Sequence, residues 1–431
     1  MEYIPVLVLV LSFIFFLAIG TPVAWSITLS SLLTMLVSIP ALPALTTVSQ
    51  RIGTGLDSFA LLAIPFFILS GELMNKGGIA HRLIAFAKTL VGALPGGLAL
   101  INIFSAMLMG AIAGSAMASA SAMGSILGPE MEKDGYSKEF GAAVNITSAT
   151  TGLVIPPSNV LIVYSLASGG ASIAALFLAG YIPGILTGLF LMIVASVWAK
   201  RKGYKVGKRS SWKAMFSTFI DALPSLFMLV VVIGGIVTGI FTATEASAIA
   251  VLYSLVLGFI YKEISLKNLP QILLNSSATT AIVMLLIGAS MSMSWVLSYE
   301  NIPQDISSGL LSLSDNKIMI LLIINLLLLI VGIFMDMTPA VLIFTPIFLP
   351  VVTKLGLDPV HFGIIMVLNL CIGLCTPPVG SVLFVGVGIA KTTIEKVVKP
   401  LIPLFLAMIL ALFLVTYFPQ LSLWLPALFD L

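Results

Sequence analysis

Two proline pairs, Pro156-Pro157 and Pro377-Pro378, interrupt apolar stretches of this sequence, and each follows glycine and hydroxyl residues. A proline inside a helix removes an amide donor and clashes with the preceding turn, at a cost of about 3 kcal/mol or more. A helix broken there leaves carbonyl and hydroxyl oxygens that can bind a cation, and a new helix N-terminus that suits an anion. An alternative, for one pair alone, is a kink stabilised by neighbouring helices. Two such pairs favour ion binding.

The two proline pairs belong to an internal repeat. Four pairs of segments match in order and spacing: 110–115 with 332–337, Pro129 with Pro350, 136–137 with 357–359, and 152–157 with 373–378. Each half predicts an amphipathic stretch (about 78–93 and 302–314), a helical hairpin (about 96–133 and 316–355) and a broken helix (about 136–168 and 359–390). Counted along the membrane, the halves run in opposite directions. Inverted repeats with discontinuous helices are typical of transporters that bind substrate and ions at the midplane of the bilayer.

Small and polar residues at the hairpin tips and breaks are the candidates for this site. The first half offers Ser115, Ser119, Asn145, Ser148, Thr150, Thr151 and Gly152; the second offers Asp336, Thr338, Asn369, Gly373, Thr376 and Gly380. A carboxylate inside a membrane is a functional candidate, although Asp336 also stands where it can cap the second helix of its hairpin. The small residues of the first tip have an alternative role as a helix-packing face. Hydroxyls and carbonyls outnumber carboxylates near these positions, which favours sodium over proton coupling.

Composition places these elements in a membrane. Of the 431 residues, 59% are hydrophobic and only 9% are charged, and apolar runs long enough to cross a bilayer recur from Val6 onwards. A chain in lipid must satisfy its backbone internally, which leaves helices or closed barrels, and these runs are too long for barrel strands. The sequence therefore predicts an all-α polytopic membrane protein.

The positive charges predict an orientation and a division of the chain. Seven of the 20 Lys and Arg residues lie between positions 200 and 213, which assigns this loop to the cytoplasm and the N-terminus to the opposite, periplasmic side. Arg51 and Lys354 are exceptions to the pattern. The predicted parts are scaffold helices 1–57, a first repeat 58–200, a basic cytoplasmic loop 201–221, a second repeat 222–419 and a C-terminal tail 420–431.

An enzyme and a channel are weaker alternatives. The chain has only His81 and His361, which lie far apart, and no base is placed near Ser115 or Ser119 to activate a nucleophile. A channel does not need two inverted broken helices around one site. The sequence therefore predicts a transporter that is not an enzyme.

Several motifs resemble the large membrane subunit of tripartite ATP-independent periplasmic (TRAP) transporters, and the similarity covers nearly the whole chain. They are Gly71-Glu-Leu-Met, Leu94-Pro-Gly-Gly, Gly110-Ala-Ile-Ala-Gly-Ser, Ile155-Pro-Pro-Ser, Phe241-Thr-Ala-Thr-Glu-Ala, Phe334-Met-Asp-Met-Thr-Pro and Thr376-Pro-Pro-Val-Gly. The resemblance implies sodium-coupled uptake of a carboxylate, such as a C4-dicarboxylate or sialic acid, across the bacterial inner membrane. It also implies an elevator-type fold with two re-entrant hairpins, a periplasmic substrate-binding protein, and a small membrane subunit that we expect to be a separate chain.

The resemblance also assigns candidate residues. The expected sodium ligands are Ser115, Asn145, Ser148, Thr151, Gly152, Asp336, Thr338, Gly373, Thr376 and Gly380, with Na⁺ as the coupling ion. The expected substrate-binding residues are Ser119, Pro156, Asn369 and Pro377. The alternative function is a sodium/anion symporter that works without a binding protein.

Overall fold

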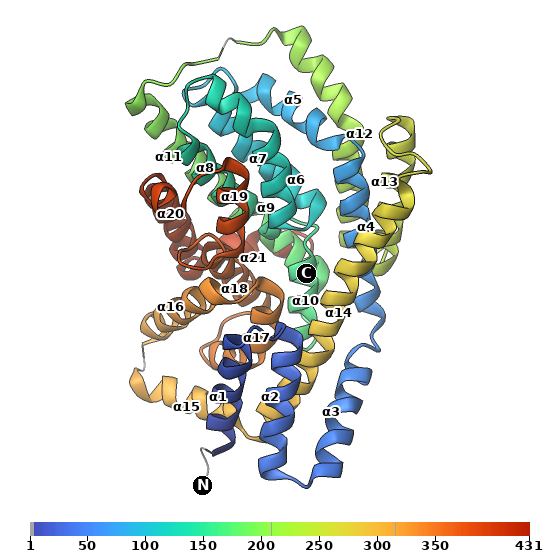
Figure 1. Ribbon diagram of the computed structural model, residues 1–431, viewed down its shortest axis with the longest axis vertical. Helices are drawn as coiled ribbons and strands as arrows, with labels where there is room; N and C mark the ends of the chain where they lie inside the picture. The colour runs from blue at the N-terminus through green and yellow to red at the C-terminus, as the bar shows by residue number, and fades with distance from the viewer. Residues whose placement is uncertain (1–3, 208, 315) are drawn as a thin grey trace.

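The computed structural model describes residues 4–207, 209–314 and 316–431, and its regular elements in these ranges are all helices (Figure 1). Eight helices are long and apolar enough to cross a membrane, and the bent pair 138–154 and 159–167 makes up to nine. Large hydrophobic side chains are exposed along them, as a lipid-facing surface requires; Leu252 is 64% exposed and Ile193 58%.

The first half of the chain contains one complete set of the predicted elements. Its helices are α1 (Ile4–Ala18), α2 (Val23–Ser38), α3 (Ala41–Gly55), η1 (Phe59–Leu62), α4 (Ala63–Lys76), α5 (Ile79–Val91), α6 (Gly97–Ala113), α7 (Ala116–Lys133), α8 (Lys138–Ala149), α9 (Thr151–Val154), α10 (Asn159–Ala167) and α11 (Ile173–Lys202). Helices α6 and α7 form the first hairpin, and α8 to α10 form the first broken helix.

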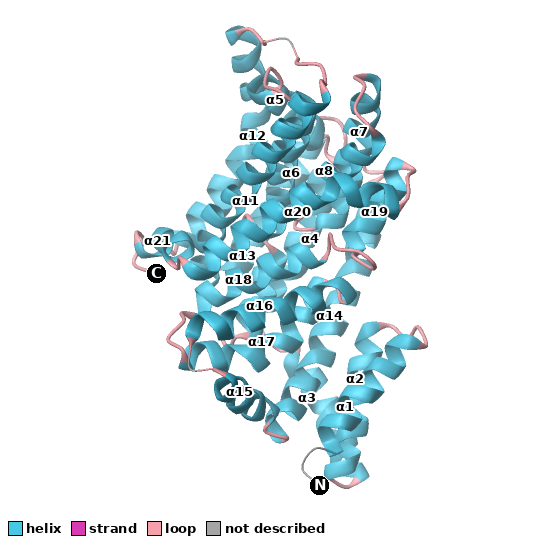
Figure 2. Cartoon of the chain, turned by 90° about the vertical axis from the view of Figure 1, so that its left-hand side faces the viewer, coloured by secondary structure: helices cyan, strands magenta, loops and turns pink. Residues whose placement is uncertain are grey.

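The second half begins with two linking helices, α12 and α13, and then repeats this order. Its helices are α12 (Trp212–Val237), α13 (Ala243–Ile260), α14 (Leu269–Tyr299), α15 (Ile302–Leu313), α16 (Lys317–Phe334), α17 (Met337–Lys354), α18 (Pro359–Gly373), α19 (Ser381–Ala390), α20 (Ile394–Tyr417) and α21 (Gln420–Ala427). The amphipathic helices α5 and α15 lie at opposite ends of the molecule, as inverted repeats require (Figure 1). The side view in Figure 2 places α1, α2 and α3 at the same end as α15. That the hairpins are re-entrant in a membrane remains a prediction.

Both proline pairs lie in true interruptions, so the kinked-helix alternative is wrong. Helix α9 ends at Val154 and α10 begins at Asn159, with a bend of 51° between the two parts of this pair. Helix α18 ends at Gly373, and α19 does not begin until Ser381. Both Pro-Pro peptide bonds are cis. The chain therefore leaves helical geometry twice inside the helical body.

Each hairpin tip touches the broken helix of its own half through a pair of glycines. A Cβ atom on Gly110 would stand 2.2 Å from the Cα of Gly152, and one on Gly373 would stand 2.5 Å from the Cα of Gly332. No side chain fits at such a distance, so the two backbones are in direct contact in both halves. These contacts lie at matching repeat positions and hold each tip beside its break.

The two halves also contact each other at the breaks. The Sγ of Cys371 donates to the carbonyl oxygen of Thr150 at 3.3 Å, and the Sγ of Cys375 donates to that of Ile146 at 3.4 Å. On the far side of the first break, the Tyr164 hydroxyl donates to the carbonyl oxygen of Pro359 at 2.6 Å. The cysteines are therefore small core residues that allow the broken helices to cross closely.

Two predicted boundaries differ from the structure. The basic loop spans 203–211 instead of 201–221, because Gly203 ends α11 in a left-handed conformation and the Ser211 hydroxyl caps α12 by accepting from the amide of Ala214. The predicted C-terminal tail is mostly helix, since α21 covers 420–427. Helix α13 begins with a capping box, in which Thr242 and Glu245 bond reciprocally.

Candidate ion and anion site between the hairpin tips

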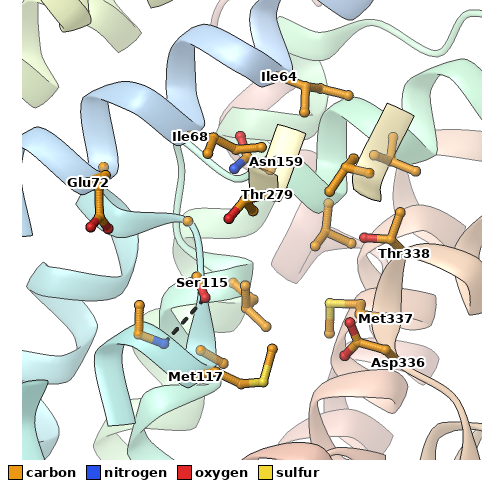
Figure 3. A pocket seen from close by; sticks show the side chains of 18 of the residues that line it. Ile64, Ile68, Glu72, Ser115, Met117, Asn159, Thr279, Asp336, Met337 and Thr338 are labelled. Atoms are coloured by element: carbon orange, nitrogen blue, oxygen red, sulfur yellow. Dashed lines mark hydrogen bonds between the residues drawn. The ribbon is translucent and has the colours of Figure 1, made fainter. Parts of the chain in front are cut away.

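The two hairpin tips border one cavity with a volume of about 250 Å³ (Figure 3). Ser115 reaches it from the first tip, and Asp336 and Thr338 reach it from the second. Figure 3 shows Ser115 and Asp336 on opposite sides of the open space. Helices α4 and α14 close the cavity with Glu72, Asn75, Asn275, Ser276 and Thr279. The fold thus unites residues from both halves and from two long helices outside the hairpins.

Four helices begin at this cavity. The first turns of α7, α10, α17 and α19 border it through Ser115, Asn159, Thr338 and Ser381 respectively. The first amides of a helix have no partner within the helix, and they carry the positive end of its dipole. Four such ends around one space create a positive potential without any basic side chain. This arrangement suits the carboxylate or sulfonate of a small organic anion.

The charged side chains at the cavity are acidic. Glu72 and Asp336 are the charged members of its described lining, which contains no Lys, Arg or His. An anion that enters therefore meets two carboxylates as well as the helix N-termini. Cations that bind with the anion would offset this repulsion, because a cation attracts both the protein carboxylates and the bound anion.

Asp336 stands at the N-cap position of α17, but its side chain makes no capping hydrogen bond there. The hydroxyl of Ser381, the first residue of α19, donates to Oδ1 of Asp336 at 3.5 Å. Asp336 thus faces the start of α19 and the cavity and does not cap its own helix. The carboxylate is placed to share a cation with the hydroxyls of Ser381 and Thr338.

The predicted residues of the first half are distributed over three environments. Ser115 caps α7, its Oγ accepting from the amide of Ala118 at 3.3 Å, and borders the cavity. Asn145 donates to the carbonyl oxygen of Ala120 at 2.8 Å and borders a separate space beside α7 and α19. Ser148 and Thr151 are buried; Ser148 donates to Oδ1 of Asn102, and Thr151 to the carbonyl oxygen of Ser148. The remaining predicted residues of the first half are also buried: Ser119, Gly152 and Pro156.

The second half shows a related distribution. Asn369 is buried and donates to Oδ1 of Asn325 on α16, which matches the contact of Ser148 with Asn102 in the first half. The Thr376 hydroxyl donates to the carbonyl oxygen of Ile372 at 2.7 Å. Gly373, Gly380 and Pro377 form the break itself. Of the fourteen predicted site residues, only Ser115, Asp336 and Thr338 are among the described cavity-lining residues.

Several lining residues were missed by the sequence analysis. Asn159 and Ser381 directly follow the two breaks, and Asn275, Ser276 and Thr279 lie on one face of α14. The polar run 275–280 inside a long apolar helix was the available signal, since polar side chains in a span usually face the protein interior. Glu72 carried no sequence signal that distinguished it from a residue paired locally near a helix end.

The sequence of the chain was compared with known proteins. The family model of the tripartite ATP-independent periplasmic transporter, DctM component, matches residues 10–421. The chain belongs to this family. As a DctM-type chain, it is a large permease of a multi-span membrane transporter, and its activity is transport and not catalysis.

Three proteins illustrate the similarity of this chain to known sequences. The Salmonella typhimurium protein YgiK is 58% identical over 99% of both chains. The isethionate TRAP transporter permease DctMQ of Oleidesulfovibrio alaskensis is 42% identical over 98% of this chain and 67% of the relative. The C4-dicarboxylate TRAP transporter large permease DctM of Rhodobacter capsulatus is 38% identical over 94% of this chain and 95% of the relative.

A solved structure shows the same fold. The YdaH transporter of Alcanivorax borkumensis superposes with a TM-score of 0.66 over 88% of this chain and 89% of its own, at 14% sequence identity. The predicted all-α polytopic fold of this DctM-type permease is confirmed.

Proposed function

We propose that this DctM-type permease imports a small organic anion together with sodium ions through the cavity between its hairpin tips. The observation that carries this proposal is the cavity itself. Four helix N-termini attract an anion, two carboxylates attract cations, and no basic side chain is among the described lining residues. Such a cavity favours an anion and cations together over an anion alone.

The anion in this proposal carries a carboxylate. Of the relatives named above, DctM of Rhodobacter capsulatus is described as a permease for a C4-dicarboxylate, and DctMQ as one for isethionate, a small organic anion whose charged group is a sulfonate. A C4-dicarboxylate or a sugar acid such as sialic acid presents its carboxylate to the helix N-termini and its remaining polar groups to Asn159, Asn275 and Thr279. These side chains supply both donors and acceptors.

Sodium is the proposed coupling ion. It favours oxygen ligands, and the second tip provides the Asp336 carboxylate together with the hydroxyls of Thr338 and Ser381. The first tip provides the Ser115 hydroxyl. The carbonyls of the two breaks are additional candidates, because proline removes donors that would otherwise occupy them.

The transport cycle in this proposal requires partners. A periplasmic binding protein delivers the anion, and a small membrane subunit holds the outer helices, while the hairpins and broken helices move together in an elevator-type step. We place the start of helix α1 on the periplasmic side, because α1 and the basic segment between α11 and α12 lie at opposite ends of the molecule (Figure 1).

Uptake into proteoliposomes tests the proposal. The chain is reconstituted alone and with its small subunit and binding protein, and uptake of labelled C4-dicarboxylate and of sialic acid is followed under an imposed sodium or proton gradient. We expect uptake of one anion that requires both partners and follows the sodium gradient. Uptake that ignores sodium but follows protons would contradict sodium coupling. Uptake by the chain alone would instead identify a self-sufficient symporter.

A further inference from the structure

A second cavity, of about 630 Å³, lies at the end of the molecule that carries the basic loop. It is bordered by α5, the start of α6, the end of α7, the loop 203–211 and α12. Its position is thus where the first hairpin meets the amphipathic helix α5, far from the site between the hairpin tips.

Three lysines border this cavity, and two of them are unpaired. Lys88 lies 3.6 Å from Glu130, whereas Lys133 and Lys205 form no ion pair with the described residues. The acidic members of the lining are Glu130 and Asp134. The cavity therefore has a net positive charge and two ammonium groups that are free to bind an anion.

Tyr136 adds a buried donor. Its side chain is 4% exposed, and its hydroxyl has no hydrogen-bond partner within the part of the chain that the structure describes. The backbone amide of Leu98, in the first turn of α6, approaches the hydroxyl oxygen as a donor, so the function that lacks a partner is the O–H proton. Burial raises the pKa of Tyr136 to about 12, so the hydroxyl keeps its proton and can donate at neutral pH. A buried polar group without a partner is costly, and a bound oxygen ligand would remove that cost.

The surface next to the cavity is apolar. Phe219 of α12 packs on Phe86 of α5, with ring centroids 5.6 Å apart. Leu90, Phe216 and Ile220 are exposed by 40%, 63% and 46% on these two helices. A ligand with a charged head and apolar chains matches both surfaces, whereas a free phosphate ion would use only the polar one.

We propose that this cavity binds the phosphate of an anionic phospholipid, with the head group beside Lys133, Lys205 and Tyr136 and the acyl chains along the exposed face of α12. Basic pockets beside helices on the cytoplasmic side of a membrane are suited to such head groups. The site is independent of the transported anion, and it would link the first hairpin to α5 at the membrane surface.

Native mass spectrometry of the purified full chain tests this site. The protein is incubated with phosphatidylglycerol, with phosphatidylcholine of the same acyl chains, or with inorganic phosphate, and the bound molecules are counted. We expect several-fold more phosphatidylglycerol than phosphatidylcholine on the unchanged chain. The double variant K133Q/K205Q should lower phosphatidylglycerol binding about 25-fold, since each lysine near a membrane surface contributes about a fivefold change in affinity. The conservative variant Y136F should lower it less.

The matched control is K396Q/K399Q, which removes two exposed lysines near the start of α20 that do not border the cavity. It should leave phosphatidylglycerol binding unchanged, and the melting temperature of each variant shows that it folds. Equal binding of the two lipids, or equal loss in the control, would overturn the site. Binding of inorganic phosphate that the same variants abolish, without preference for lipid, would overturn the lipid assignment.

Discussion

The two broken helices follow one sequence plan but differ in burial. Residues 151–158 of the first break are all buried, whereas Pro378 and Val379 of the second are exposed and Pro377 is half-buried. Helix α11 covers the first break, where Gly180 lies against the carbonyl oxygen of Val154 and Gly184 lies against Ile155. The second break instead opens beside Asp336 and the cavity.

The difference in burial indicates that the two breaks have different roles, although their sequences match in the repeat. In the first half, the hydroxyls of Ser148, Thr150 and Thr151 donate to the backbone carbonyls of their own segment, so this break is a fixed junction. In the second half, the Asp336 carboxylate faces the cavity, and the Ser381 hydroxyl donates to it at the long distance of 3.5 Å. We therefore expect structural damage to be larger from changes in the first break, and ion dependence to be altered more by changes in the second.

The largest effect is expected at the glycine contacts. A Cβ on Gly152, at the first break, would stand 2.0 Å from the Cα of Gly110, whereas one on Gly373, the matching residue at the second break, would stand 2.5 Å from the Cα of Gly332. Both changes force backbone atoms apart, so G152A should destabilise the protein by about 3 kcal/mol or more and G373A by less, about 2 kcal/mol. Thermal unfolding in detergent measures both. The control is G234A on α12, where a Cβ meets open space. Equal losses in G152A and G373A would contradict the proposed difference.

The next effect is expected at the second tip. D336N removes the negative charge from the cavity side of α17 and should raise the sodium concentration for half-maximal uptake at least about tenfold, since a full charge contributes more than a dipole at short range. Sodium titration of uptake in proteoliposomes checks this. D305N, on the exposed surface of α15, serves as the control. A titration curve of D336N that matches the unchanged chain would exclude Asp336 as a cation ligand.

A smaller difference in stability is expected between changes at Asn369 and Ser148, whose buried hydrogen bonds lie at matching positions of the two halves. Asn369 donates to Asn325, which in turn donates to Thr416 at 3.2 Å, whereas the hydroxyl of Ser148 is shared between Asn102 and the carbonyl oxygen of Asn145. N369A should cost about 2–3 kcal/mol, because it leaves a void and deprives the side-chain oxygen of Asn325 of its donor, and S148A about 1 kcal/mol. Urea or thermal unfolding ranks them. The reverse order would show that the first half depends more on its polar contact than the geometry indicates.

The smallest effects are expected from removing single hydroxyls, that of Ser115 at the first hairpin tip and that of Thr376 at the second break. S115A removes a helix cap worth about 1 kcal/mol and an oxygen at the cavity, so sodium dependence should weaken by roughly threefold. T376A should weaken it less, because the Thr376 hydroxyl already donates to the carbonyl oxygen of Ile372. Unchanged sodium titration curves for both variants would exclude Ser115 and Thr376 as sodium ligands.

The pattern of residues was sufficient to locate the breaks but not the cavity lining. Pro156-Pro157 and Pro377-Pro378 disrupt helices by local stereochemistry, so their effect is visible in any sequence. Ser115, Asp336 and Thr338 were found because they stand at the hairpin tips. Asn369 was assigned to the substrate on its position near a break, yet it faces α16. Helical phase decides which neighbour a side chain meets, and an apolar chain that packs on all sides shows little periodicity from which to read that phase.

The sequence by itself determined the helical class, the interruptions and the inverted order of the halves, since hydropathy, proline chemistry and repeat spacing are local properties. Only the tertiary structure decided which break is covered, which acids face the cavity and which lysines remain unpaired. The physical reason is that these properties depend on contacts between segments far apart in the chain. Glu72 of α4 and Asp336 of α17 border one space only after both hairpins have packed against the long helices.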